Sequence, residues 1–232
     1  MKRLARQYQI IGLQETHGTA GREQAYVAPP GFCAFWAHGT NCKAGIALLI
    51  EDSFLGLFHH REWAIVDEGR VAMIRLSGSL GDLDLWVRYL DSHDQDARSE
   101  SLCKIAGQFT QPSAALSLMF GDFNFTTDPC DRLNKRTGGW SGDTNTANVK
   151  VLLDMVCRPF GDAEWSQPEH TCEIGTARSK IDRVYGNQHL SEQLDRQLEC
   201  VALNFPYGLS VHRPVAFARR LPAGREMLAP SL

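Results

Sequence analysis

A strongly apolar run, Ala114–Phe120, ends abruptly in the tetrapeptide Gly121-Asp122-Phe123-Asn124. The run predicts a buried strand, and the residues that follow place Asp122 and Asn124 on one face at its C-terminal end. Open α/β sheets form their sites at that end of their strands. A carboxylate can bind a hard cation or accept a proton, and a carboxamide can orient an oxygen, so the pair indicates chemistry. The same residue types are common in turns, and a simple strand-to-turn transition remains the alternative.

The rest of the chain alternates apolar runs with turn-rich segments. Further strands are predicted at 10–13, 44–50, 71–76, 83–90, 181–186, 201–205 and 214–217. Helical spacing predicts helices over 96–109 and 149–156, the first capped by Asp94 or Asp96 and the second stopped by Pro159. The polar stretch 126–145 is expected to be a loop. This pattern indicates an α/β fold of two sheets with helices outside, in one domain.

Composition excludes several classes of protein. The chain has 232 residues with 43% hydrophobic content, enough for a sizeable core, and no apolar run approaches the roughly 20 residues that span a bilayer. The seven cysteines are scattered without a CxxC motif, which favours reduced thiols and an intracellular location. The net charge of −3 argues against a uniformly basic coat for nucleic acid, although it leaves room for a local basic rim.

Two basic groups could form such a rim. One follows the Gly-Asp-Phe-Asn turn, and the other precedes the predicted strand at 181–186. Their candidate substrate-binding residues are Arg132, Lys135, Arg136, Arg178 and Lys180. The alternative is that both groups are solvated loops.

Acidic and aromatic residues at other predicted strand ends add to the candidate site. Glu15 follows the first strand and is a possible oxygen ligand for Mg²⁺, or else an exposed turn acid. Asp182 lies on an otherwise apolar strand face, so it needs a partner, and His212 is the best candidate. Tyr89 ends another strand, where its phenol could bind a phosphate oxygen or simply be an interior aromatic.

Six segments of this kind occur in a fixed order, and together they resemble the endonuclease/exonuclease/phosphatase family. They are Gln14-Glu-Thr-His17, the apolar run 44–50, Tyr89, Gly121-Asp-Phe-Asn124, Ser179-Lys-Ile-Asp-Arg-Val-Tyr185 and Ser210-Val-His-Arg-Pro-Val215. The first and fifth are most similar to the apurinic-like endonuclease domain of non-LTR retrotransposons. The resemblance covers roughly residues 4 to 218, so we expect a domain over 1–218 and a tail or linker over 219–232.

The resemblance implies a four-layer α/β sandwich and phosphodiester hydrolysis that depends on Mg²⁺ or Mn²⁺. Glu15 would hold the metal, Asp122 would orient or deprotonate the attacking water, and Asn124 would position that water. Asp182 would hold His212, which would stabilise charge on phosphorus, and Tyr89 would contact the scissile phosphate. The implied partner is DNA, with no membrane association. In the intact element a reverse transcriptase domain could follow, and the implied location is the nucleus.

Two departures from the family pattern bear on activity. The family begins with a strand that ends in a metal-site Asn, whereas this chain is expected to start in the helix after that strand, as if truncated. The family's final motif is Ser-Asp-His, and here it is Ser210-Val211-His212. Loss of two oxygen groups would weaken metal binding. The alternatives are an inactive truncated copy, a phosphate- or nucleic-acid-binding module, and an enzyme for a non-DNA phosphoester.

Overall fold

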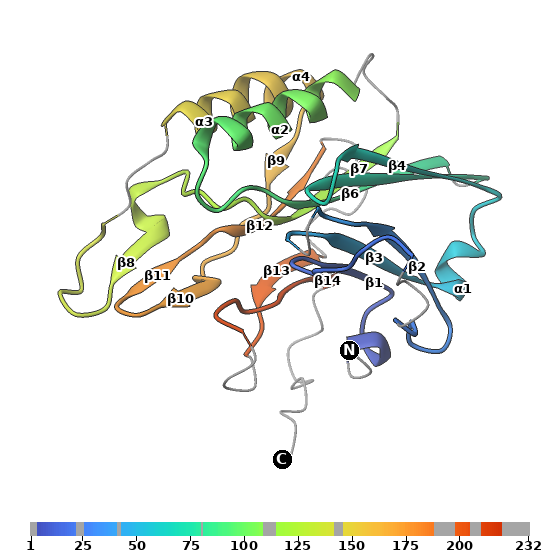
Figure 1. Cartoon of the computed structure of the whole chain (residues 1–232), viewed down its shortest axis with the longest axis horizontal. Coiled ribbons are helices and arrows are strands. Elements are labelled where there is room, and N and C mark those ends of the chain that lie inside the picture. Colours follow the sequence, from blue (N-terminus) through green and yellow to red (C-terminus); the bar gives the residue numbers. More distant parts are fainter. Residues whose placement is uncertain are drawn as a thin grey trace.

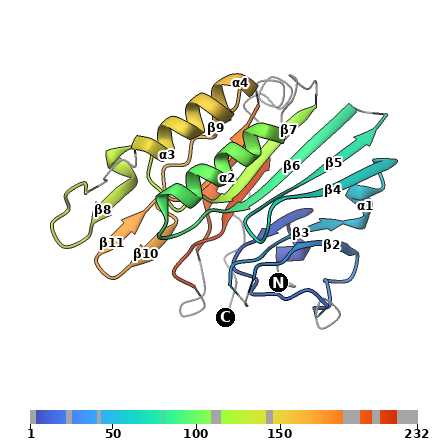
Figure 2. The same cartoon turned by 45° about the horizontal axis from the view of Figure 1, so that its top comes forward.

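The computed structural model describes residues 4–21, 26–40, 43–79, 81–108, 115–141, 146–187, 198–204 and 210–219. Within these ranges the chain forms an α/β sandwich, in which a six-stranded sheet separates a helical layer from smaller sheets (Figure 1 and Figure 2). This arrangement confirms the predicted fold class. No helix in the described ranges is long and apolar enough to cross a membrane.

The large sheet is mixed and carries most of the candidate site. Its order is β4-β5-β6-β7-β12-β9, where only β6 and β7 are parallel neighbours. The strands are β4 (His60–Asp67), β5 (Val71–Gly78), β6 (Gly81–Tyr89), β7 (Leu116–Asp122), β9 (Ala163–Glu164) and β12 (Asp182–Gly186).

Three smaller sheets complete the strand structure. The order β1-β3-β2 joins β1 (Ile10–Leu13), β2 (Phe32–Ala37) and β3 (Ile46–Glu51). A two-stranded sheet pairs β13 (Leu198–Ala202) with β14 (Val215–Arg219). The order β10-β11-β8 joins β8 (Arg132–Asn134), β10 (Cys172–Ile174) and β11 (Ala177–Ser179), and this unit projects beside the body of the molecule (Figure 1).

The main helical layer covers one face of the large sheet. It consists of α2 (Gln95–Gln108) and a continuous run of α3 (Thr146–Val151), the π-helical η4 (Leu152–Cys157) and α4 (Arg158–Phe160). Shorter helices are η1 (Leu4–Arg6), α1 (Asp52–Leu55) and η3 (Pro129–Asp131). Among the described residues, only η1 and α1 lie beside the β1-β3-β2 sheet, so a full fourth layer is not part of these ranges.

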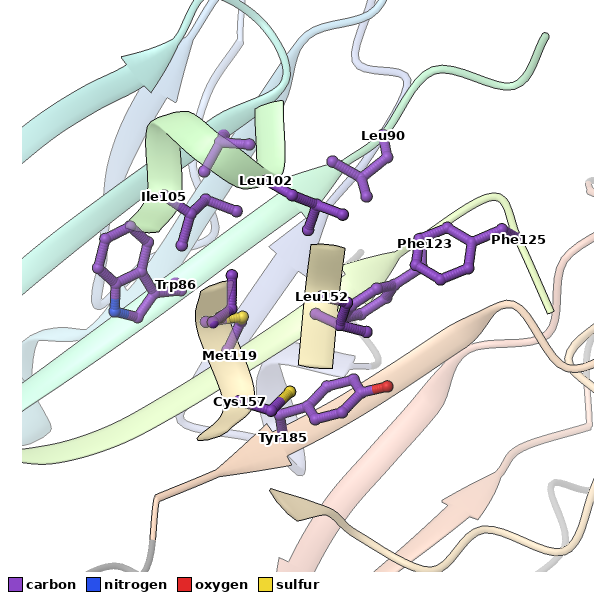
Figure 3. Close-up of a cluster of buried hydrophobic side chains, with 12 residues drawn as sticks. Trp86, Leu90, Leu102, Ile105, Met119, Phe123, Phe125, Leu152, Cys157 and Tyr185 are labelled. Atoms are coloured by element: carbon purple, nitrogen blue, oxygen red, sulfur yellow. The ribbon is translucent and has the colours of Figure 1, made fainter. Parts of the chain in front are cut away.

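Strict alternation along β6 divides the core into two clusters. Leu85 and Val87 point toward the β1-β3-β2 sheet, whereas Trp86 points toward the helices. On the helical side, Trp86 packs with Leu102 of α2 and Leu152 of η4 (Figure 3). β6 is buried on both faces over most of its length, and the run at 83–90 is apolar except for Asp84, which pairs with Arg75, and Arg88, whose guanidinium lies over the Phe123 ring.

Two sequence predictions about loops and helix ends were wrong. The stretch 126–145 contains η3 and β8, which pairs with β11 through backbone hydrogen bonds that side-chain polarity does not reveal. Pro159 does not stop its helix, which continues to Phe160 and ends at Gly161 with a left-handed φ of 66°. Pro159 is tolerated because it lies in the first turn of α4, directly after the π-helical segment, where its missing N–H removes little.

The other boundaries agree within a few residues. Asp94, rather than Asp96, caps α2, because its Oδ1 accepts the backbone N–H of both Asp96 and Ala97. Six strands were not predicted from the sequence, namely β2, β4, β8, β9, β10 and β11. Residue 219 ends β14, and 220–232 lie outside the described residues, as do Ala114 and Phe205.

Candidate active site

Strand register brings three of the candidate side chains into one row. Asp122, the last residue of β7, is paired with Tyr89 at the end of β6 and with Asp182 at the start of β12. A shift in the pairing of β7 with β6 or with β12 would separate these three residues. The sheet therefore explains why residues distant in sequence converge at one edge.

The turn after β7 depends on a glycine. Gly121 has a φ of 136°, and a Cβ added there would lie 2.0 Å from the carbonyl oxygen of Arg88. This close approach allows β6 and β7 to run side by side up to the row. Asn124 then adopts a left-handed φ of 54°, its N–H donates to Asp122 Oδ1 (2.8 Å), and its Nδ2 donates to the Leu90 carbonyl (2.8 Å). The orientation of both polar side chains is thus fixed.

His212 lies against both carboxylates of the row. Its Nδ1 is 3.0 Å from Asp182 Oδ2, and its Nε2 is 3.9 Å from Asp122 Oδ2. A β-bridge between His212 and Cys172 holds the backbone beside β10. The expected pairing of Asp182 with His212 is therefore present in the structure.

Glu15 joins the group from the other sheet. It follows β1 with a left-handed φ of 51°, and its carboxylate accepts a hydrogen bond from the Tyr89 hydroxyl. Burial and this hydrogen bond raise the pKa of Tyr89, so the phenol keeps its proton at neutral pH. The structure thus brings Glu15, Tyr89, Asp122, Asp182 and His212 to one place between the two sheets. Their functional roles stay predictions.

The electrostatics suit proton transfer and anion binding. Burial raises the pKa of Asp122, and the neighbouring Asp182 raises it further, to about 8, although His212 opposes the shift. Burial alone would lower the pKa of His212, but its hydrogen bonds with Asp182 and Cys172 and the negative charges of Asp182 and Asp122 together raise it to about 11. A protonated imidazole can donate to a phosphoryl oxygen. Asp122 can accept a proton from water only in its ionised form, which its raised pKa makes the minor form at neutral pH and which a nearby cation would favour.

Two supporting residues were missed by the sequence analysis. Arg70 lies over the Tyr89 ring, with its guanidinium carbon 4.9 Å from the centroid, and pairs with Asp91 at 2.6 Å. Thr171 accepts the backbone N–H of Asp182 through its Oγ1 (3.1 Å). Arg70 could have been found by counting the hairpin register, since Val71 pairs with Arg88 and Arg70 therefore flanks Tyr89. Thr171 carries no such signal, because its position depends on the unpredicted β10.

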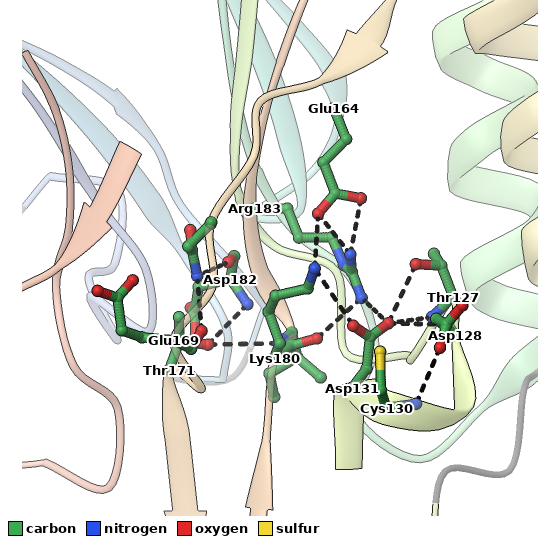
Figure 4. Close-up of polar contacts among 12 residues, drawn as sticks. Thr127, Asp128, Cys130, Asp131, Glu164, Glu169, Thr171, Lys180, Asp182 and Arg183 are labelled. Atoms are coloured by element: carbon green, nitrogen blue, oxygen red, sulfur yellow. Dashed lines mark hydrogen bonds and ion pairs between the residues drawn. The ribbon is translucent and has the colours of Figure 1, made fainter. Parts of the chain in front are cut away.

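The candidate substrate-binding cations occupy two different environments. Lys180 is 21% exposed and lies 3.3 Å from both Asp131 and Glu164, in a network that also includes the buried Arg183 (Figure 4). Burial by itself would raise the pKa of Asp131, yet the charge and hydrogen bond of Arg183, together with the Thr127 N–H and the charge of Lys180, outweigh burial and lower the value to about 2. This network connects η3 and β9 to β12. Lys180 therefore contacts carboxylates that stabilise the fold.

The remaining four cations lie on the β10-β11-β8 unit. Lys135 and Arg178 both pair with Glu173, the latter at 2.8 Å. Arg132 donates to Ser179 Oγ at 3.3 Å. Arg136 is exposed at the turn that follows β8. The structure places them on one projecting unit next to His212, and their contact with substrate stays a prediction.

A sequence model of the endonuclease/exonuclease/phosphatase family matches residues 1–200. The chain belongs to this family. The match extends over all six strands of the large sheet and over all candidate residues except His212. No curated protein matches the sequence.

Solved structures show the same fold at low sequence identity. The catalytic domain of Xenopus laevis APE2 is 16% identical, with a TM-score of 0.66 over 94% of this chain and 85% of that one. An AP endonuclease from Archaeoglobus fulgidus is 14% identical, with a TM-score of 0.60 over 94% and 91%. A humanized TDP2 of D. rerio is 14% identical, with a TM-score of 0.53 over 79% and 72%. At these identities the likeness establishes the fold.

The donor atoms fit the divalent metal that the family implies. Asp122, Asp182 and His212 each offer a ligand atom, and these atoms lie within 4.8 Å of one another. The oxygens of Asp122 and Asp182 are donors suited to a hard cation such as Mg²⁺ or Mn²⁺, and the carboxylate of Glu15, which accepts from the Tyr89 hydroxyl, would add a further oxygen ligand. Val211, which stands where the family has an acid, is 51% exposed and adds no ligand atom.

Proposed function

We propose that this chain is a metal-dependent phosphodiesterase that nicks DNA. The observation that supports the proposal most strongly is the Asp182–His212 pair, held at 3.0 Å beside the buried Asp122. A carboxylate next to a protonated imidazole can activate water and stabilise the charge that develops on the phosphoryl oxygens. The group lies where β6 and β7 end, and open α/β sheets bind substrates at the carboxyl ends of their parallel strands, which supports the proposal.

The residues divide the work of hydrolysis between them. Asp122 takes a proton from the attacking water, whose oxygen forms the new bond to phosphorus as the bond to the leaving oxygen breaks, and the alkoxide that leaves takes a proton from solvent. His212, oriented by Asp182, donates a hydrogen bond to a phosphoryl oxygen. Asn124 and Tyr89 position the water and the phosphate. A divalent ion held by Glu15 with Asp122 or Asn124 would supply further charge neutralisation.

A supercoiled plasmid tests this proposal directly. We expect a nick that requires Mg²⁺ or Mn²⁺ and that is slowed roughly 10²- to 10⁴-fold by Asp122→Asn or His212→Gln, because each removes one proton-transfer or charge-stabilising group. Asp154→Asn, an equally conservative change on an exposed helical carboxylate, is the matched control and should nick at the native rate. Folded protein that binds DNA but does not nick it would instead identify a binding module.

The finer attributes rest on the motif resemblance. We propose that the domain derives from a non-LTR retrotransposon, that it acts on nuclear DNA, and that a reverse transcriptase follows it in the intact element. The adjoining coding sequence tests the last point. An in-frame polymerase downstream would support the proposed reverse transcriptase domain, and an unrelated gene there would contradict it.

A further inference from the structure

The β10-β11-β8 unit, here called the arm, is locally cationic in a protein of net charge −3. The arm comprises residues 132–141 and 172–179, with four cationic side chains, Arg132, Lys135, Arg136 and Arg178, and one carboxylate, Glu173. Glu173 pairs with two of the cations and can neutralise only one charge. The arm therefore retains an excess of positive charge, which favours a polyanion as its partner.

A large aromatic side chain is exposed on the same arm. Trp140 is 59% exposed, and its ring stacks on that of His170 with centroids 6.1 Å apart and planes 24° apart. A β-bridge to Leu133 and the hydrogen bond from Ser141 N to Arg132 O (2.9 Å) fix the backbone around it. The indole is thus held in position before any partner arrives, which lowers the entropy lost on binding.

The stacked rings of Trp140 and His170 are connected through backbone contacts to both Asp182 and His212. His170 precedes Thr171, whose Oγ1 accepts the N–H of Asp182. The His170 carbonyl accepts a hydrogen bond from Arg213 Nη1 (3.2 Å), and Arg213 directly follows His212. A β-bridge between Cys172 of β10 and His212 adds a third connection, so the arm adjoins the place where a phosphate bound by His212 would lie.

An exposed aromatic is not by itself a binding site, because single apolar residues are normal on protein surfaces. Trp140 differs because it is oriented by a ring beneath it, lies among excess cations and adjoins the catalytic pair. An aromatic face next to cations matches the chemistry of an unstacked base next to its phosphates. A binding site for a protein partner would instead have apolar side chains around the tryptophan.

We propose that Trp140 is a stacking platform for an unpaired base of the DNA, so that the arm selects substrate with a locally unstacked nucleotide. This inference rests on the proposed function for the identity of the nucleic acid. It adds a contact outside the row of Tyr89, Asp122 and Asp182.

Binding of labelled oligonucleotides tests the platform without any turnover. The full chain is titrated in EDTA, at one stated salt concentration, with single-stranded DNA, an intact duplex and a duplex carrying one bulged nucleotide. We expect Trp140→Leu, which keeps apolar bulk but has no π-face, to weaken binding of the single-stranded and bulged DNA roughly tenfold. Trp140→Phe should retain most of the affinity, and the intact duplex should change little.

Two controls separate stacking from charge and from general damage. Tyr26→Ala removes another exposed aromatic, which contacts Trp36 of β2 away from the arm, and should leave all three affinities unchanged. Arg136→Ala should reduce the slope of affinity against salt by about one, whereas Trp140→Leu should leave that slope unchanged.

The proposal is overturned if Trp140→Leu binds as Trp140→Phe does, or if it weakens the intact duplex equally. Equal weakening by Tyr26→Ala would also overturn it. Thermal melting of each variant verifies that it is folded. Because EDTA removes the nicking reaction, failure of the plasmid assay leaves this test intact, and the two proposals can fail separately.

Discussion

Substitution of Gly121 by alanine is the sharpest test of how the site is built. The position has a φ of 136°, and an added Cβ would lie 2.0 Å from Arg88 O and 3.0 Å from Arg88 C. These are backbone atoms of β6, and β12 closes the other side through the pairing of Gly121 with Arg183. Neither neighbour can rotate away as a side chain could, so the strands themselves must separate.

The expected loss of stability follows from two contributions. A non-glycine residue held at such a φ costs about 1–3 kcal/mol, and overpacking against a rigid neighbour costs about 1–3 kcal/mol more. The sum, roughly 2–6 kcal/mol, is a large share of the roughly 5–15 kcal/mol that holds a domain folded. For a chain of this length it corresponds to a melting temperature lower by roughly 5–20 °C.

Gly107 supplies the matched control, because the same substitution there has the opposite sign. It lies on the exposed side of α2, where an added Cβ meets no atom within 4 Å. Gly107→Ala should stabilise the helix by about 0.5–1 kcal/mol. Circular dichroism melts of both variants decide the matter. A Gly121→Ala protein that melts within about 2 °C of the native one would refute the close packing of β6 against β7.

Three further outcomes are expected. The pKa of His212 is raised to about 11, so the stability it contributes is full below about pH 6.5 and is lost as the pH rises toward 11; melts of His212→Gln in EDTA should show a deficit that shrinks along that range. Burial raises the pKa of Asp162 to about 7, despite Arg88, so Asp162→Asn should gain stability relative to the native protein as the pH rises from 4 to 7, and a pH-independent difference would contradict this. Val211→Asp should strengthen Mg²⁺ binding in calorimetry, because it restores an oxygen ligand, and unchanged affinity would mean that position 211 faces away from the site.

The sequence predicted the parts of the fold that are buried on both faces. The strands β3, β6 and β7 were recognisable because most of their residues are buried and apolar, with Asp84 and Arg88 of β6 as charged exceptions. Edge strands such as β4 are half exposed and carry residues like His60 and Glu62 among the apolar ones. The three-residue strands of the arm are too short to show any period, so none of them was predicted, and β8 lies in the stretch that was expected to be a loop.

The candidate site was recognisable as residue types at strand ends, but its geometry was not. Asp122 and Asp182 are 60 positions apart, and their pairing depends on the register of β7 against β12. No local pattern gives that register. The pairing of Asp182 with His212 was predicted, because a carboxylate on an apolar strand face needs a partner, whereas the hydrogen bond from Tyr89 to Glu15 was not.

Charge illustrates the remaining gap between sequence and structure. Lys180 and Arg136 carry the same sign and were candidates on the same grounds, yet Lys180 lies 3.3 Å from two carboxylates while Arg136 is exposed on the arm. Removing Lys180 therefore takes a partner from buried Asp131, which acts on folding, whereas removing Arg136 takes a charge from solvent, which acts on long-range attraction. A basic residue near an active site thus indicates a substrate contact only once its carboxylate neighbours are known. In this chain the positive charge that carboxylates do not neutralise lies on the arm, beside Trp140.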